Sequence, residues 1–134
     1  MSTKSLYDIY ASSKEAWDAM YKTIESAQKS IYWEMYTLSD DDAGKDFFDL
    51  LEKKAAQGVD IKLIIDSWGT FWFPKKRVHS LKAAGVELLF FQERKRRYRG
   101  LWLKLISRTH RKILVVDEKV GFIGGVNVQK DMES

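Results

Sequence analysis

The chain has 134 residues and a mass of 15.7 kDa, with 45% hydrophobic and 31% charged residues, a balance typical of a folded globular protein rather than a disordered one. It contains no cysteine, which excludes disulfides, thiolate metal ligands and a cysteine nucleophile, and two histidines are too few for a histidine-rich metal site. We therefore expect one domain over residues 1–134 with no metal, no cofactor, no signal peptide and no membrane-spanning segment.

The net charge of +4 is unevenly distributed along the chain. Residues 1–74 hold 8 Lys and Arg against 13 Asp and Glu, whereas residues 75–112 hold 13 basic and only 2 acidic residues. A basic block attracts polyanions, either phospholipid headgroups or nucleic acid. It is also compatible with an ordinary solvated surface, so the charge alone does not choose a partner.

The first half of the chain predicts two helices, each followed by a strand. Apolar residues at helical spacing predict a helix over residues 12–29, with a serine pair as N-cap candidates, and the β-branched and aromatic run 31–38 predicts a strand. A turn rich in aspartate leads to a second helix over 45–57, which Gly58 terminates, and to an apolar strand over 59–66.

The second half continues the alternation and then changes to strands. A short helix is predicted over 75–84 and a strand over 86–91, followed by two strands at 110–117 and 119–123 that are joined by a turn at residues 117 and 118. Helices that alternate with apolar strands favour an α/β fold with a mixed, largely parallel sheet and helices on both faces, a three-layer α/β/α sandwich.

A charged and aromatic segment at 92–109 fits this scheme poorly. A basic run is followed by an apolar stretch, a combination that suits contact with anionic lipid headgroups and the membrane interface, although it also suits nucleic acid or a core segment after a solvated loop. The residues predicted to contact a membrane or another anion are Arg94, Lys95, Arg96, Arg97, Arg99 and Trp102.

The residues that indicate chemistry begin at His110. Side chains two apart on a strand point to the same face, so His110 and Lys112 should stand side by side, where an imidazole can attack phosphorus and an ammonium can neutralise the phosphate oxygens. Asp117 completes this candidate catalytic set. Along the predicted strand, Asp117 falls on the face opposite His110 and Lys112 and stands at the strand end. There we expect a structural salt bridge or hydrogen bond rather than direct catalysis.

Three further residues are candidates for binding phosphate. Gly124 and Gly125 lack side chains, which lets backbone N–H groups approach an anion closely, and Asn127 follows with an amide donor. Two carboxylates are candidates for supporting positions near this site, namely Glu34 within the first strand and Asp66 at the end of the second. For both, a structural ion pair is the simpler interpretation.

The spacing His-x-Lys-x4-Asp-x6-Gly-Gly-x-Asn over residues 110–127 resembles the signature of the phospholipase D superfamily. Residues 27–36, 55–66 and 84–87 are similar to the N-terminal half of bacterial cardiolipin synthases, so the resemblance covers the chain from about residue 12 to Asn127. It implies a metal-independent phosphodiester transfer in which one histidine forms a phosphohistidine and a second histidine, from a second motif, protonates the leaving alcohol.

By this resemblance His110 is one of the two histidines, while Lys112 and Asn127 bind phosphate; which histidine is the nucleophile stays open. The chain holds one motif copy, because His79 has no lysine two residues later and is expected on a helix surface. The family's acidic residue that orients the motif histidine would lie beyond Ser134, so we expect the isolated chain to be inactive without a C-terminal half or a homodimer partner.

We expect the chain to act on phospholipid as part of a phosphatidyltransferase at an anionic membrane surface, attached peripherally to the cytoplasmic side of the bacterial membrane. Two alternatives remain open: a homodimeric nuclease of the same superfamily, with nucleic acid the less favoured partner, and a non-catalytic module for anionic-lipid binding or assembly.

Overall fold

The computed structural model describes residues 6–66, 73–91, 112–125 and 127–128, and it contains all eight predicted elements. The elements in chain order are α1 (Ser13–Glu25), β1 (Ser30–Met35), α2 (Lys45–Ala56), β2 (Asp60–Asp66), α3 (Lys75–Ala84), β3 (Glu87–Phe91), β4 (Ile113–Val116) and β5 (Val120–Ile123). None of the helices in the described part of the chain is long and apolar enough to cross a membrane.

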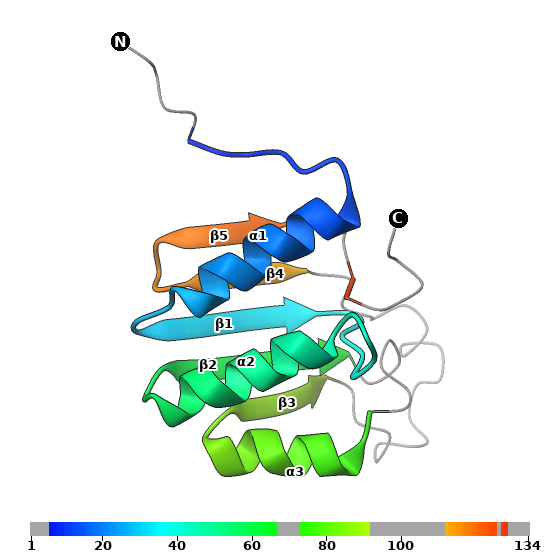
Figure 1. Cartoon of the computed structure of the whole chain (residues 1–134), viewed down its shortest axis with the longest axis vertical. Helices are drawn as coiled ribbons and strands as arrows, with labels where there is room; N and C mark the ends of the chain where they lie inside the picture. The colour runs from blue at the N-terminus through cyan, green and yellow to red at the C-terminus, as the bar shows by residue number, and fades with distance from the viewer. Residues whose placement is uncertain (1–5, 67–72, 92–111, 126, 129–134) are drawn as a thin grey trace, which may run out of the picture.

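The five strands form one mixed sheet in the order β3-β2-β1-β4-β5 (Figure 1). Strands β1, β2 and β3 are parallel, while β4 runs antiparallel to both β1 and β5. The ends of β1, β2, β3 and β5 and the beginning of β4 therefore lie at one edge of the sheet, which we call the carboxyl edge.

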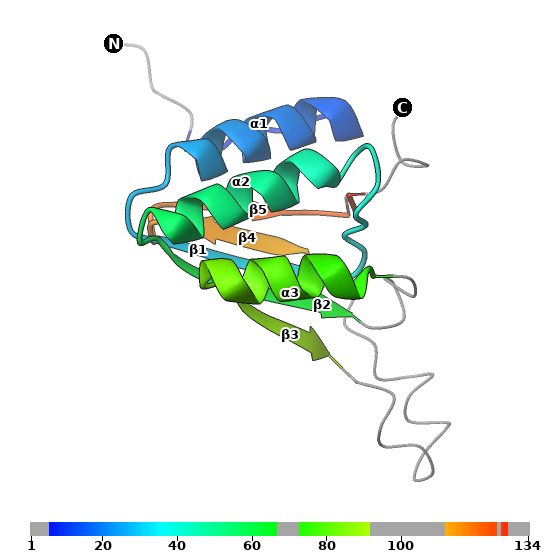
Figure 2. The same ribbon diagram turned by 60° about the horizontal axis from the view of Figure 1, so that its bottom comes forward.

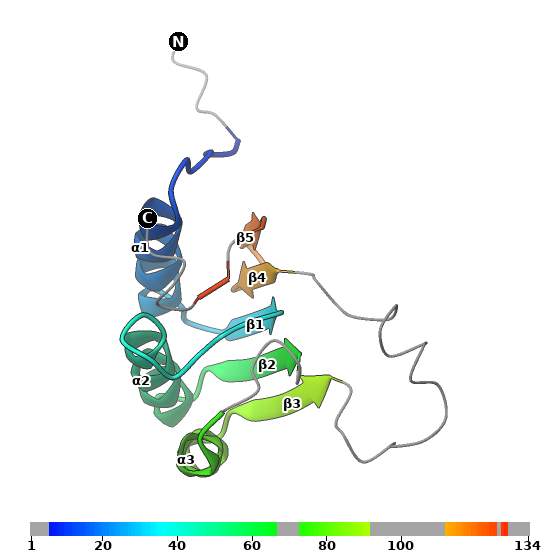
Figure 3. The ribbon, with the colours of Figure 1, turned by 90° about the vertical axis from the view of Figure 1, so that its right-hand side faces the viewer.

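Helices α1, α2 and α3 lie on one face of the sheet (Figures 2 and 3). Ile31, Trp33 and Met35 of β1 face the helices, are at most 2% exposed and form part of the core with the apolar sides of the helices. The expected α/β class and mixed sheet are confirmed, with two of the four strand pairings parallel. The described residues supply the sheet and one helical layer of the expected sandwich.

Three predicted elements are shorter in the structure than their apolar patterns. The strand predicted over 110–117 is described as β4 over Ile113–Val116, so Lys112 stands just before the strand and Asp117 just after it. Helix α1 ends at Glu25, and the residues after it make other hydrogen bonds. The Ser26 hydroxyl donates to the Thr23 carbonyl, and the backbone N–H groups of residues 28–30 donate to the carboxylate of Asp117, which follows β4. Strand β1 ends at Met35, and beyond it Leu38 forms an isolated parallel bridge with Val128, outside the five-stranded sheet.

Candidate functional site

Lys112 lies at the carboxyl edge, directly before the first residue of β4. Its Nζ is 5.8 Å from the centre of the Tyr36 ring, which follows β1 at the same edge. Its backbone carbonyl accepts a hydrogen bond from the N–H of Gly124 at 3.3 Å. The antiparallel pairing of β4 with β1 and β5 therefore brings Lys112 close to the glycine pair at 124 and 125.

Asn127 is held at the same edge by two contacts. Its Oδ1 accepts a hydrogen bond from the backbone N–H of Thr37 at 3.2 Å, and its backbone carbonyl accepts one from the indole N–H of Trp17 at 3.1 Å. Because the amide oxygen is oriented by Thr37, the amide NH₂ is the group that remains to donate to a ligand. Lys112, Gly124 and Asn127 are thus connected through Tyr36 and Thr37, which are neighbours in the chain.

A cavity of about 270 Å³ opens beside these residues, on the helical face of the sheet. Lys112, Gly124 and Gly125 form part of its lining, and the rest comes from α1, β1, β4, β5 and the segment that precedes α1. An ammonium group and backbone amides next to a cavity can hold an anionic ligand without a metal ion.

Asp117 lies at the opposite end of β4 from Lys112, in the hairpin turn before β5. Its carboxylate accepts hydrogen bonds from the backbone N–H groups of Lys29 at 2.7 Å, Ser30 at 3.0 Å and Gln28 at 2.9 and 3.1 Å. These three donors hold the pKa of Asp117 below its ordinary value. Asp117 is therefore a structural anchor between α1 and β4 and does not share the carboxyl edge with Lys112.

The two supporting carboxylates occupy different surroundings. Asp66 ends β2 at the carboxyl edge and is fully buried. Glu34 is paired in register with Ile64 and Ile113, on the sheet face opposite the helices and therefore opposite the cavity. The structure brings neither into the lining of the cavity.

Several predicted site residues lie outside the described residues. They are His110 and the anion-contact set Arg94, Lys95, Arg96, Arg97, Arg99 and Trp102. His79 is described: it lies in α3 and is exposed, so its assignment to a helix surface is confirmed.

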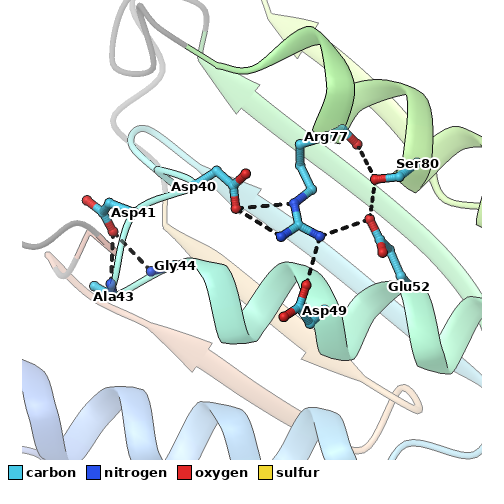
Figure 4. A network of polar contacts seen from close by, with 8 residues as sticks. All are labelled: Asp40, Asp41, Ala43, Gly44, Asp49, Glu52, Arg77 and Ser80. Carbon is cyan, nitrogen blue, oxygen red and sulfur yellow. Dashed lines mark hydrogen bonds and ion pairs between the residues drawn. The ribbon is translucent and has the colours of Figure 1, made fainter.

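A network of polar contacts around Arg77 of α3 was not predicted from the sequence (Figure 4). The Arg77 guanidinium forms ion pairs with Asp40 at 3.1 Å, Asp49 at 2.9 Å and Glu52 at 3.0 Å, and Glu52 also accepts a hydrogen bond from Ser80. The network joins α3 to α2 and to the loop that follows β1. The sequence does contain an indication of this network. A cation in the first turn of a helix interacts unfavourably with the helix dipole, so acidic side chains from elsewhere in the fold are expected beside it.

The chain matches a known protein family. A family model described as "Cardiolipin synthase, PLD-like domain" matches residues 20–132. The chain belongs to this family. The match takes in every strand of the sheet and both Lys112 and Asp117, the residues that flank β4.

Among curated members, the chain is 38% identical over 121 residues to a cardiolipin synthase of Clostridium perfringens, a match that covers 90% of this chain and 25% of the relative. It is 32% identical over 131 residues to the probable cardiolipin synthase YwiE of Bacillus subtilis, covering 98% of this chain and 26% of the relative. The chain thus spans about a quarter of the length of the curated relatives it matches.

Two solved structures share the fold. NucT from Helicobacter pylori superposes with a TM-score of 0.61 at 17% identity, covering 96% of this chain and 76% of that one. Nuc from Salmonella typhimurium, a phospholipase D family member, superposes with a TM-score of 0.58 at 21% identity, covering 87% and 66%. The two structures support the phospholipase D-like fold of this cardiolipin synthase-like chain.

Proposed function

We propose that this chain supplies one phosphate-binding half of a phosphatidyltransferase that acts on phospholipids. In this proposal Lys112 and the Asn127 amide hold the non-bridging phosphate oxygens, and the N–H groups of Gly124 and Gly125 add donors. The observation that supports the proposal is the set of direct contacts that gathers Lys112, Gly124 and Asn127 at the carboxyl edge beside a cavity.

His110 takes one of two roles in the proposed reaction. One histidine nitrogen attacks phosphorus, the bond from phosphorus to the leaving alcohol oxygen breaks, and the second histidine gives that oxygen a proton. The second histidine then removes a proton from the acceptor alcohol, whose oxygen displaces the first histidine from phosphorus. Covalent geometry keeps the Cα of His110 within about 7 Å of the Cα of Lys112, whatever the conformation of the residues between them.

The second histidine must come from outside this motif, either from a C-terminal half of the same protein or from a second copy of the chain. The proposal places the whole protein peripherally at the anionic, cytoplasmic surface of a bacterial membrane, where residues 94–102 contact headgroups. Asp117 takes no part in the chemistry and acts on the site only by holding β4 in place.

Phosphate binding tests the site without requiring turnover. Titration of inorganic phosphate, followed by the ¹⁵N NMR spectrum of the chain, should show weaker binding for Lys112→Met by about 10- to 100-fold, the loss expected for a hydrogen bond to a charged group. Lys119→Met is the matched control, because Lys119 is exposed in the turn at the other end of β4. Equal affinities of the two variants for phosphate would contradict the proposed site.

A second experiment tests the reaction. The chain is mixed with a C-terminal half that carries a second motif, supplied with phosphatidylglycerol vesicles and assayed for cardiolipin. Cardiolipin formation that His110→Ala abolishes supports the proposal. Cleavage of DNA by the same mixture, with vesicles left unchanged, would favour the nuclease alternative.

A further inference from the structure

The cavity beside Lys112 has a polar end and an apolar body. Lys112, Gly124 and Gly125 lie at the carboxyl edge, where the candidate phosphate contacts gather. Away from that edge the lining is apolar side chains from α1 and the sheet, together with Asp8 of the exposed N-terminal segment. The apolar side chains that line this part of the cavity include Ala16, Met20, Leu114 and Phe122. A ligand that consists only of phosphates and sugars has no group that fits this body.

The outer rim of the cavity is also apolar, and it is exposed. Ile9 and Ile123 both line the cavity, yet each is 87% exposed. The segment before α1 passes on the β5 side of the sheet (Figure 1). Its Tyr10 ring, which lines the cavity, stacks on Phe122 with the ring centres 6.4 Å apart. Exposed apolar side chains at the mouth of a cavity, here Ile9 and Ile123, mark contact with an apolar phase.

From these two features we propose that the cavity holds one hydrocarbon chain of an anionic amphiphile that enters from a lipid surface. The anionic head lies at Lys112 and the glycine pair, the chain runs between α1 and the β4–β5 hairpin, and the Ile9 and Ile123 side chains rest in the lipid surface. The inference deepens the proposed function and rests on it, because it uses the same phosphate contacts to place the head.

The size of the cavity limits the occupant. A volume of about 270 Å³ is slightly below the range of roughly 300–1,000 Å³ that is usual for small-molecule sites. The cavity therefore accepts one chain rather than the pair of chains of a diacyl lipid. Each methylene transferred from water should tighten binding about fourfold until the chain fills the cavity.

The test is a series of monoalkyl phosphates with four to ten carbons, used below their micelle concentrations, with inorganic phosphate as the reference ligand. Isothermal titration calorimetry with the 134-residue chain gives the affinity and the stoichiometry. We expect one site per chain and an affinity that rises by about 200-fold between the butyl and the octyl compound.

Two substitutions and one control locate the hydrocarbon chain. Ala16→Leu fills part of the cavity from α1 and should lower the ratio of octyl-phosphate to inorganic-phosphate affinity by about tenfold. Ile123→Asn makes the exposed rim polar without adding charge and should lower the ratio by about fivefold. Val120→Asn changes a side chain of the same strand that is 45% exposed but does not line the cavity, and should leave the ratio unchanged.

The outcomes separate this inference from the proposed function. If phosphate binds through Lys112 but chain length has no effect, the hydrocarbon site is refuted while the phosphate site stands. If chain length matters equally in Ile123→Asn, Ala16→Leu and Val120→Asn, the alkyl group binds elsewhere and the inference is refuted. If neither phosphate nor any alkyl phosphate binds, both proposals fail. Because Ile123 is exposed, its variant keeps the test valid even if Ala16→Leu does not fold.

Discussion

Replacing Asp117 by asparagine removes the negative charge that three consecutive backbone N–H groups share, while keeping the shape of the side chain. The Asp117 backbone has a φ of 54°, a left-handed conformation that asparagine tolerates as well as aspartate does, so the substitution tests the carboxylate and not the turn. An oxygen of asparagine can keep the bonds to Lys29 and Ser30, but as neutral ones, and its NH₂ group then faces the N–H of Gln28.

A buried hydrogen bond to a charged group contributes about 1 kcal/mol more than a neutral one, but the bonds from Gln28 and Lys29 are exposed and solvent screens the charge, so we expect a total loss of about 1 to 2 kcal/mol in the free energy of unfolding. For a chain of this length the loss corresponds to a fall in Tm of about 5 °C. Urea denaturation at pH 7 gives the free energy, and scanning calorimetry gives the Tm. The control is Glu118→Gln, which removes a charge from the next turn residue and should change the free energy of unfolding by less than about 0.5 kcal/mol.

The pH dependence follows from the lowered pKa of Asp117 in the folded protein. The contribution is complete above the ordinary aspartate pKa of about 3.9 and is lost as the pH falls through the folded value, because the unfolded chain takes up the proton first. The difference in stability between wild type and Asp117→Asn should therefore be constant from pH 7 to 5 and should shrink below about pH 4. A difference that is absent at pH 7, or as large at pH 3, would refute the reasoning.

Two further substitutions test packing at the ends of α2. Lys54 is 7% exposed, and its ammonium donates a hydrogen bond to the Glu25 carbonyl at the end of α1. Lys54→Met should therefore lower the free energy of unfolding, measured in urea, by about 2 kcal/mol. An unchanged free energy would contradict a stabilising role for this hydrogen bond. At Gly44 an added Cβ collides with the Ser39 carbonyl oxygen, so Gly44→Ala should cost at least about 2 kcal/mol in thermal unfolding. Gly121→Ala, with only one distant neighbour, should be nearly neutral and serves as its control.

The features that could be predicted from the sequence depend on neighbours within the chain. The strand predicted over 31–38 is found as β1, and the alternation of Ile31 and Trp33 with Tyr32 and Glu34 puts the apolar pair on its buried side, because side chains alternate between the faces of any strand. The helix predicted over 75–84 is found as α3, and Gly85 terminates it with a φ of 107°, a conformation that favours glycine. The position of Asp117 at a strand end predicted a structural bond, and its distance from the carboxyl edge speaks against its place in the candidate catalytic set.

The features that could not be predicted depend on tertiary contacts between distant segments. Trp17 and Asn127 are 110 residues apart, and nothing near either one in the sequence indicates that an indole N–H meets that carbonyl. The position of the Tyr36 ring near Lys112 depends on the pairing of β1 with β4, which the elements alone do not determine. The cavity likewise exists only because α1, the N-terminal segment and the hairpin come together.

Strand β4 has an anchor at one end and the phosphate-binding lysine at the other, and this limits how the motif can change in evolution. The number of residues from Lys112 to Asp117 determines which face of the sheet the lysine occupies. With the anchor in place, insertion or deletion of one residue would turn the ammonium to the other side, away from Gly124 and the cavity. Relatives that bind phosphate in this way should therefore differ in β4 by substitution and keep its length.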